Sequence, residues 1–198
     1  MKVLNKTSLT ILLSVISIHF GYSQIIGKVN GEGNKAKFRS NTVVYLEKVN
    51  GHFKAPLKNP IMDQKKLVFS PHVMPVVAGT TVDFLNSDDV LHNVFCPDKC
   101  CKFDLGSYGK GVRKSEMFDK AGTQSVILCN VHPEMEAYIV VLQNPYFDLT
   151  DKEGNFRIEN VPPGKYVLKV WNEKYKAKEQ MITVSASDKL NVNFELTK

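Results

Sequence analysis

Three side chains that bind soft transition metals lie within seven residues of one another in the second half of the chain. They are Cys129, His132 and Met135, in a C-x-x-H-x-x-M run that follows the apolar, strand-like residues 123–128. Mononuclear copper sites use these ligand types, with two imidazoles and one thiolate in a trigonal plane and a long axial thioether. The run lacks one imidazole, and we expect His92, at the edge of another β-like segment, to supply it.

The spacing of the run allows its side chains to converge. If Cys129 closes a strand and Pro133 opens a short helical turn, His132 lies at the cap and Met135 one turn further on. Proline suits the first helical position because its φ is fixed there and its missing N–H would have had no partner. Each of these residues alone is better explained by packing or surface exposure, but together they predict a copper site.

The two segments that carry these residues, 91–95 and 129–135, resemble those of the cupredoxins, the blue-copper electron carriers. The short loop is most similar to that of the amicyanin and plastocyanin-like group, and the resemblance covers about residues 61–142. It implies a Greek-key β-sandwich that holds one type 1 copper ion. The metal ligands that the resemblance implies are His92, Cys129, His132 and Met135.

A ligand set of this kind favours electron transfer over catalysis. With four protein ligands there is no open position for a substrate, in contrast with a catalytic metal. We therefore expect no enzyme but a carrier of single electrons between a protein donor and a protein acceptor. Two alternatives remain: a copper carrier or storage protein that uses the Cys-rich residues 96–101 without electron turnover, and a cell-envelope binding module in which copper is structural.

Groups close to the ligands are expected to orient the thiolate. Asn93 and the amides of residues 130–132 are the candidates. Val131 stands where many relatives of the cupredoxin family carry proline, so it keeps an N–H that could donate a hydrogen bond to the sulfur of Cys129. Of the remaining histidines, we expect a structural or surface role for His72 and a loop position for His52.

The other three cysteines, Cys96, Cys100 and Cys101, follow the His92 segment, which suggests a loop that passes near the metal. The simplest expectation is one disulfide, from Cys96 to either Cys100 or Cys101, with one thiol left over. The spare thiol offers a route to a dimer. A second copper(I) site of soft thiolates, or a redox switch beside the copper, is the alternative.

The beginning of the chain has the pattern of a secretory signal. Lys2 and Lys6 precede an apolar run at residues 9–20 and the small residues Gly21 and Ser23, so we predict cleavage after Ser23. The run is shorter than the roughly 20 apolar residues that a membrane span needs. We therefore expect a periplasmic or secreted protein with no transmembrane segment after signal removal.

Composition agrees with a folded, exported protein. The 198 residues are 43% hydrophobic and 23% charged, which is ordinary for one or two globular domains. Loss of Lys2 and Lys6 with the signal lowers the formal charge from +6 to +4. Because the lysines are scattered through turns, they indicate a solvated surface and no nucleic-acid groove.

The two ends of the chain carry a second set of strand patterns. A T-D-x-x-G-x-F run at 150–156 and a P-P-G-x-Y run at 162–166 resemble the carboxypeptidase regulatory-like domain, a transthyretin-type β-sandwich. The G-x-V and V-x-L strands that precede these runs in that family stand at 27–29 and 44–46, and Leu46 and Thr150 are 104 positions apart.

We therefore predict an all-β protein in which a discontinuous carboxypeptidase regulatory-like sandwich, residues 24–58 plus 145–198, carries a cupredoxin domain, residues 59–144, in a surface connection. Insertions of this kind succeed where the ends of the guest lie close together. The alternative is that residues 24–58 supply leading strands to the cupredoxin domain, with the two sandwiches packed side by side.

Overall fold

A computed structural model describes residues 23–31 and 33–198. The predicted signal, apart from Ser23, lies outside these residues. Within the described ranges the chain forms seventeen β-strands and one 3₁₀ helix, Gly33–Phe38. The predicted all-β class is confirmed. In the same ranges we find no helix with the length and apolar character of a membrane span.

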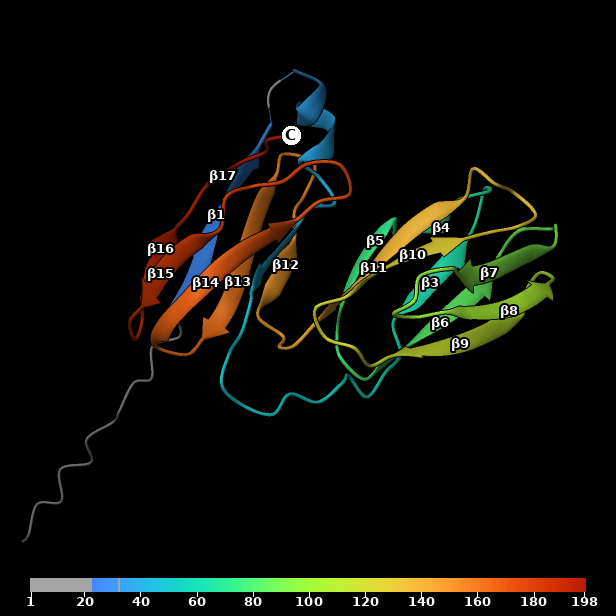
Figure 1. Ribbon diagram of the computed structural model, residues 1–198, viewed down its shortest axis with the longest axis horizontal. Coiled ribbons are helices and arrows are strands. Elements are labelled where there is room, and N and C mark those ends of the chain that lie inside the picture. Colours follow the sequence, from blue (N-terminus) through green and yellow to red (C-terminus); the bar gives the residue numbers. More distant parts are fainter. Residues whose placement is uncertain (1–22, 32) are drawn as a thin grey trace, which may run out of the picture.

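Strands from both ends of the chain form one sandwich, which we call the outer sandwich (Figure 1). One sheet has the order β13-β1-β16, with β17 also paired to β1, and the other has the order β12-β2-β14-β15. These strands are β1 (Ser23–Asn30), β2 (Val43–Leu46), β12 (Phe147–Leu149), β13 (Asn155–Val161), β14 (Gly164–Trp171), β15 (Gln180–Val184), β16 (Lys189–Asn191) and β17 (Phe194–Glu195).

Strands from the middle of the chain form the central sandwich, beside the outer one in Figure 1. Its sheets have the orders β5-β11-β10-β7-β8 and β4-β3-β6-β9. The strands are β3 (Ile61–Gln64), β4 (Phe69–Ser70), β5 (Val73–Val77), β6 (Thr80–Asn86), β7 (His92–Cys96), β8 (Phe103–Tyr108), β9 (Arg113–Phe118), β10 (Gln124–Leu128) and β11 (Glu136–Leu142).

The outer sandwich depends on pairing between residues that are far apart in the sequence. Ile25 of β1 lies opposite Ile158 of β13, and Val44 of β2 opposite Val170 of β14. Alternate residues of these strands point into one core, as expected for a sandwich whose outer faces meet water. Leu168 of β14 is buried in this core, and Tyr166 and Val170 of the same strand pack against it.

The central sandwich has its own core, made by the facing sides of its two sheets. Val94 and Ile127, from neighbouring strands of one sheet, face Val82 and Phe84 of the other, and all four are fully buried. This core fixes the strands β7 and β10, which carry the predicted metal-binding segments.

A third apolar cluster joins the two sandwiches. Val43 of the outer sandwich packs with Val73 and Val140 of the central one. The rings of Tyr138 and Trp171 lie 5.4 Å apart across the same boundary. Buried contacts of this kind make the boundary a packed interface.

Polar contacts cross the boundary as well. The side chain of Gln143 accepts a hydrogen bond from the N–H of Val49 and donates one to its carbonyl, both at 3.1 Å. His72 lies with its Nε2 2.8 Å from the carboxylate of Glu173 and its Nδ1 3.1 Å from the carbonyl of Glu136. His72 therefore has the structural role that the sequence suggested, as a link between the sandwiches.

The T-D-x-x-G turn of the outer sandwich requires a glycine at position 154, and this requirement can be tested by substitution. Gly154 has a φ of +85°, and an added Cβ would lie 2.2 Å from the carbonyl oxygen of Val29. Gly33 also has a positive φ, +53°, but an added Cβ there meets no atom within 4 Å. We expect Gly33→Ala to lower the free energy of unfolding by about 1 kcal/mol, for the backbone conformation alone, and Gly154→Ala by about 3 kcal/mol or more because a backbone atom must also move. Denaturant unfolding monitored by circular dichroism measures both, and equal losses would contradict this account of the turn.

Candidate metal centre

His92 is the first residue of β7 and its side chain is fully buried. Its Nε2 lies 2.9 Å from a carboxylate oxygen of Asp88, four residues earlier. The other ring nitrogen, Nδ1, faces Cys129 and His132. The Asp88 contact favours the tautomer with a proton on Nε2, which leaves the lone pair of Nδ1 free to bind a metal.

Cys129 comes directly after β10 and is a free, buried cysteine. The antiparallel pairing of β10 with β7 places Leu128 opposite Phe95, which brings the next residue, Cys129, toward the beginning of β7. Its Sγ lies 4.0 Å from Nδ1 of His92.

His132 lies in the loop between β10 and β11 and is partly exposed. Its Nδ1 is 3.1 Å from Nδ1 of His92, and the two ring centroids are 4.8 Å apart. The N–H of Met135 donates to the carbonyl of His132 at 3.0 Å, which closes the tight turn expected after Pro133.

The ligand atoms of His92, Cys129 and His132 all lie within 4.8 Å of one another. Met135, 1% exposed, is buried in the same apolar cluster as Cys129. The structure thus brings the two histidines and the cysteine together, and it places the methionine at the end of the same turn. Two imidazole nitrogens and a thiol that face one another are a donor set that suits copper.

The sequence analysis missed Asp88. Its carboxylate accepts hydrogen bonds from the N–H groups of Lys66 (2.6 Å) and Leu67 (2.9 Å), in the connection from β3 to β4, as well as contacting His92. Burial acts to raise the pKa of the Asp88 carboxyl, but the N–H of Leu67, the His92 ring and the N–H of Lys66 lower this pKa to about 2. Asp88 therefore stays charged and ties His92 to another strand connection. The only available signal was its position four residues before His92.

Asn93 has the orienting role that was predicted. Its backbone N–H donates to Sγ of Cys129 at 3.5 Å, and its side-chain oxygen accepts from the N–H of Asn130 at 3.0 Å. The predicted bond from the N–H of Val131 to the sulfur is wrong, since the hydrogen bonds of the described residues include none between them. Asn93 also donates to Asp104 at 2.7 Å, which holds its amide group in place.

Tyr108 is a second residue that the sequence did not single out. It lies opposite His92 in the pairing of β7 with β8, and its hydroxyl accepts from the amide of Gln64 at 2.7 Å and donates to the carbonyl of Phe84 at 3.3 Å. Burial raises the pKa of the Tyr108 hydroxyl, so the group stays neutral. This network connects β8, the strand paired with the one that carries His92, to the opposite sheet.

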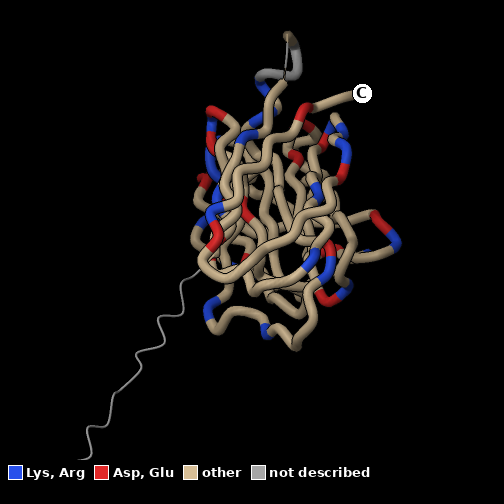
Figure 2. The backbone as a smooth tube through the Cα atoms, turned by 90° about the vertical axis from the view of Figure 1, so that its left-hand side faces the viewer, with Lys and Arg blue, Asp and Glu red and all other residues tan. Residues whose placement is uncertain are grey.

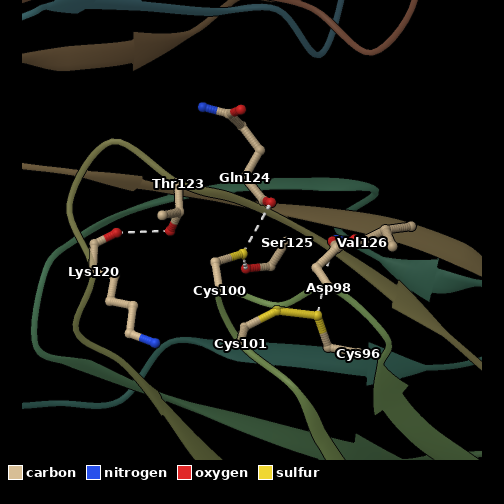
Figure 3. The surroundings of a disulfide bond; sticks show 9 residues. All are labelled: Cys96, Asp98, Cys100, Cys101, Lys120, Thr123, Gln124, Ser125 and Val126. Carbon is tan, nitrogen blue, oxygen red and sulfur yellow. Dashed lines mark hydrogen bonds between the residues drawn. A yellow bond between two sulfur atoms is a disulfide. The ribbon is translucent and has the colours of Figure 1, made fainter.

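The cysteine loop lies away from these ligands. Cys96 is bonded to Cys101, which is one of the two predicted pairings, and Cys100 is free (Figure 3). Cys96 is four residues along β7 from His92, or about 13 Å in an extended strand. Cys100 contacts Gln124, at the opposite end of β10 from Cys129. The expected position of the loop near the metal is therefore wrong, because the strand carries the chain away from the ligands.

Residues 135–197 match the family model of the carboxypeptidase regulatory-like domain. The match spans β11 to β17 and contains both motifs from which that resemblance was predicted. No curated protein matches the chain in sequence.

Solved structures with a similar arrangement include copper proteins. A mutant of amicyanin with Cu(I) is 23% identical, with a TM-score of 0.40 over 42% of this chain and 81% of amicyanin. A purple cupredoxin from Nitrosopumilus maritimus is 23% identical, with a TM-score of 0.38 over 42% of this chain and 99% of that protein. A copper-containing nitrite reductase from Thermus scotoductus is 28% identical, with a TM-score of 0.40 over 48% of this chain and 25% of the reductase.

The role of Asp88 can be tested by substitution. We expect Asp88→Asn to weaken copper(II) binding about tenfold, because a neutral amide no longer fixes the His92 ring or accepts all three hydrogen bonds. Asp89→Asn is the matched control, since its neighbouring carboxylate is 85% exposed and contacts Lys110 at the surface. Competition with a chelator of known affinity measures both variants. Equal copper(II) affinities of the two variants would contradict a role for Asp88 in metal binding.

Proposed function

We propose that the chain binds one type 1 copper ion through His92, Cys129, His132 and Met135 and carries single electrons between a protein donor and a protein acceptor. The observation that carries this proposal is the convergence of two imidazole Nδ1 atoms and a buried free thiol, from the beginning of β7 and from the loop between β10 and β11. When bound, copper supplies a one-electron couple, and this mixed nitrogen and sulfur ligand set suits both of its oxidation states.

Each surrounding residue has a defined task in this proposal. Asp88 holds the proton of His92 on Nε2, so that Nδ1 is ready as a ligand. The N–H of Asn93 donates to Cys129, which stabilises the thiolate form of the sulfur. The thioether of Met135, buried in the same cluster as Cys129, would be a further ligand of the ion. Because strands and a tight turn hold these groups, they need to move little when the charge of the ion changes.

Electron exchange needs a route to the surface, which His132 provides as the partly exposed member of the group. Apolar residues adjacent to the ligands in sequence are exposed as well: Leu91 by 58% and Val131 by 46%. A partner protein could cover them while its own redox centre approaches His132. The proposed docking relies on this apolar contact. Figure 2 faces the outer sandwich, on which basic and acidic residues are mixed along the backbone.

We also propose the division of the chain into a cupredoxin domain at residues 59–144 and an outer sandwich made of 24–58 and 145–198. The pairing of β2 with β12 supports it, because Val43 and Leu149, on either side of the central sandwich in sequence, are direct neighbours. With a signal at residues 1–23, this protein would act in the periplasm or outside the cell, as a carrier and not as an enzyme.

The visible spectrum of the copper(II) protein tests the proposal. We expect an intense blue or green band that one electron per chain bleaches reversibly, because the thiolate of Cys129 is bound to the ion. Cys129→Ser should abolish the band, whereas His52→Ala, an exposed histidine of a loop, should leave it unchanged. Colourless binding of several copper(I) ions, with no band, would instead favour the storage alternative.

A further inference from the structure

The connection from β2 to β3, residues 47–60, runs from the outer sandwich to the central one without forming a helix or a strand (Figure 1). Side-chain contacts nevertheless hold it in place. The rings of Phe53 and Tyr146 meet edge to face, with their centroids 5.8 Å apart. Near the end of the connection, the amide of Asn59 donates to the carboxylate of Asp83 at 2.9 Å. The connection therefore presents its remaining side chains to the surroundings in fixed places.

The tip of this connection is apolar. Leu57 is the most exposed of the large apolar side chains in the described ranges, at 108% of the reference value. Pro56, the residue before it, lines a surface hollow of about 300 Å³ together with Pro60, Val77 and Phe147. A single exposed leucine is ordinary in a protein, so the surroundings of Leu57 decide its meaning.

The same connection is basic. Its lysines are Lys48, Lys54 and Lys58, all of them exposed, and no acidic residue follows Glu47 until β3 begins. Glu47 is itself paired with Lys169 of β14. The ion pairs found among the described residues include none with the three lysines of the connection. Their charges are therefore available to an anionic partner.

The length of β3 separates this connection from the candidate metal centre. The connection enters the strand at Ile61, whereas Gln64, the last residue of the strand, pairs with Asn86 at the end of β6. Asp88, which contacts His92, comes two residues after this pair. The basic connection and the metal centre therefore lie at opposite ends of β3.

We propose that the connection docks the protein on a membrane surface that contains anionic phospholipids. Lys54 and Lys58 contact the phosphate groups, and Leu57, between them, enters the apolar layer just below the headgroups. Lysines near an anionic bilayer and one inserted apolar side chain each contribute modestly, so the binding is reversible. In this orientation the candidate metal centre lies at the end of the central sandwich that is remote from the membrane.

The small size of the feature favours a membrane over an acidic protein as the partner. A stable protein interface buries roughly 800 Å² on each partner, around an apolar core. The connection offers a single leucine between two lysines, beside a small hollow. A bilayer needs no matching shape, because its headgroups rearrange around a few side chains. Lysine stems can also lie along apolar surface while their charged ends stay in the polar layer.

Co-sedimentation with lipid vesicles tests the proposal, on protein purified after export so that the predicted signal is absent. We expect binding to vesicles of equal parts phosphatidylglycerol and phosphatidylcholine, and none to phosphatidylcholine alone. Added salt should weaken the binding, because it screens the lysines. The double substitution Lys54→Glu and Lys58→Glu should weaken it about tenfold or more. Leu57→Asp should weaken it about fivefold, because the inserted apolar side chain is lost.

Matched controls come from exposed residues of the outer sandwich. The double substitution Lys176→Glu and Lys178→Glu makes the same change of charge, and Met181→Asp removes an apolar side chain that is 79% exposed. Both controls should bind the vesicles like the unsubstituted chain. Circular dichroism checks that every variant is folded.

Equal binding to the two kinds of vesicle would overturn the proposal, and so would variants of the connection that bind as their controls do. Failure to bind vesicles, with retention on immobilised polyglutamate that requires Lys54 and Lys58, would assign the connection to an acidic protein instead. The measurement needs no copper. A chain that binds the vesicles but shows no visible band with copper(II) would contradict the proposed electron carrier alone, so the two proposals fail separately.

Discussion

The register between β7 and β10 is the constraint on which the candidate metal centre depends. Leu128 pairs with Phe95, so Cys129 lies just beyond the end of β10 and beside the first residues of β7, where His92 stands. Neighbouring strands are only about 4.8 Å apart, but a slip by one residue would turn every side chain of a strand to the opposite face. The buried side chains of Val94 and Ile127 prevent such a slip, because it would expose them to water. The apolar core therefore sets the ligand geometry.

Much of the fold and part of the candidate metal centre could be predicted from the sequence, because both depend on patterns between residues that are close together in the chain. The run from Cys129 to Met135 contains its own turn, and the alternation in β14 fixes which side chains face the core. The contribution of Asp88 was out of reach, since it depends on the orientation of the His92 ring and on the connection from β3 to β4, which lies far away in sequence. For the disulfide of Cys96, the sequence left two possible partners, Cys100 and Cys101. These two residues are adjacent in the chain, so only the three-dimensional geometry of the hairpin decides between them.

The ends of the central sandwich lie close together, so its residues can be inserted into the outer sandwich without distorting it. Leu46, the last residue of β2, donates its N–H to the carbonyl of Tyr146, just before β12, at 3.0 Å, and its carbonyl accepts a hydrogen bond from the side-chain amide of Asn144 at 2.9 Å. The chain thus leaves and re-enters the outer sandwich at one place, and the intervening strands can fold around a core of their own. The apolar cluster of Val43, Val73 and Val140 then covers what would be an exposed face on each side. Burial of this face holds the sandwiches together without contact to the ligands.

The thiol of Cys129 is free although the chain has three other cysteines, and the strand geometry keeps it out of a disulfide. Disulfides need Cα atoms within about 7 Å of each other. Leu128 pairs with Phe95, so Cys129 lies opposite Val94, which is two residues or about 7 Å along β7 from Cys96 and about 5 Å across on the neighbouring strand. The Cα atoms of Cys96 and Cys129 are therefore about 8 Å apart. At that separation a disulfide between Cys96 and Cys129 would require the backbone to move, and Cys96 is bonded to Cys101 instead. Burial of Cys129, which is 3% exposed, protects it from external thiols as well. The register of β7 and β10 thus places one disulfide beyond the last residue of β7, and a single free thiol that faces two histidines toward its first residue.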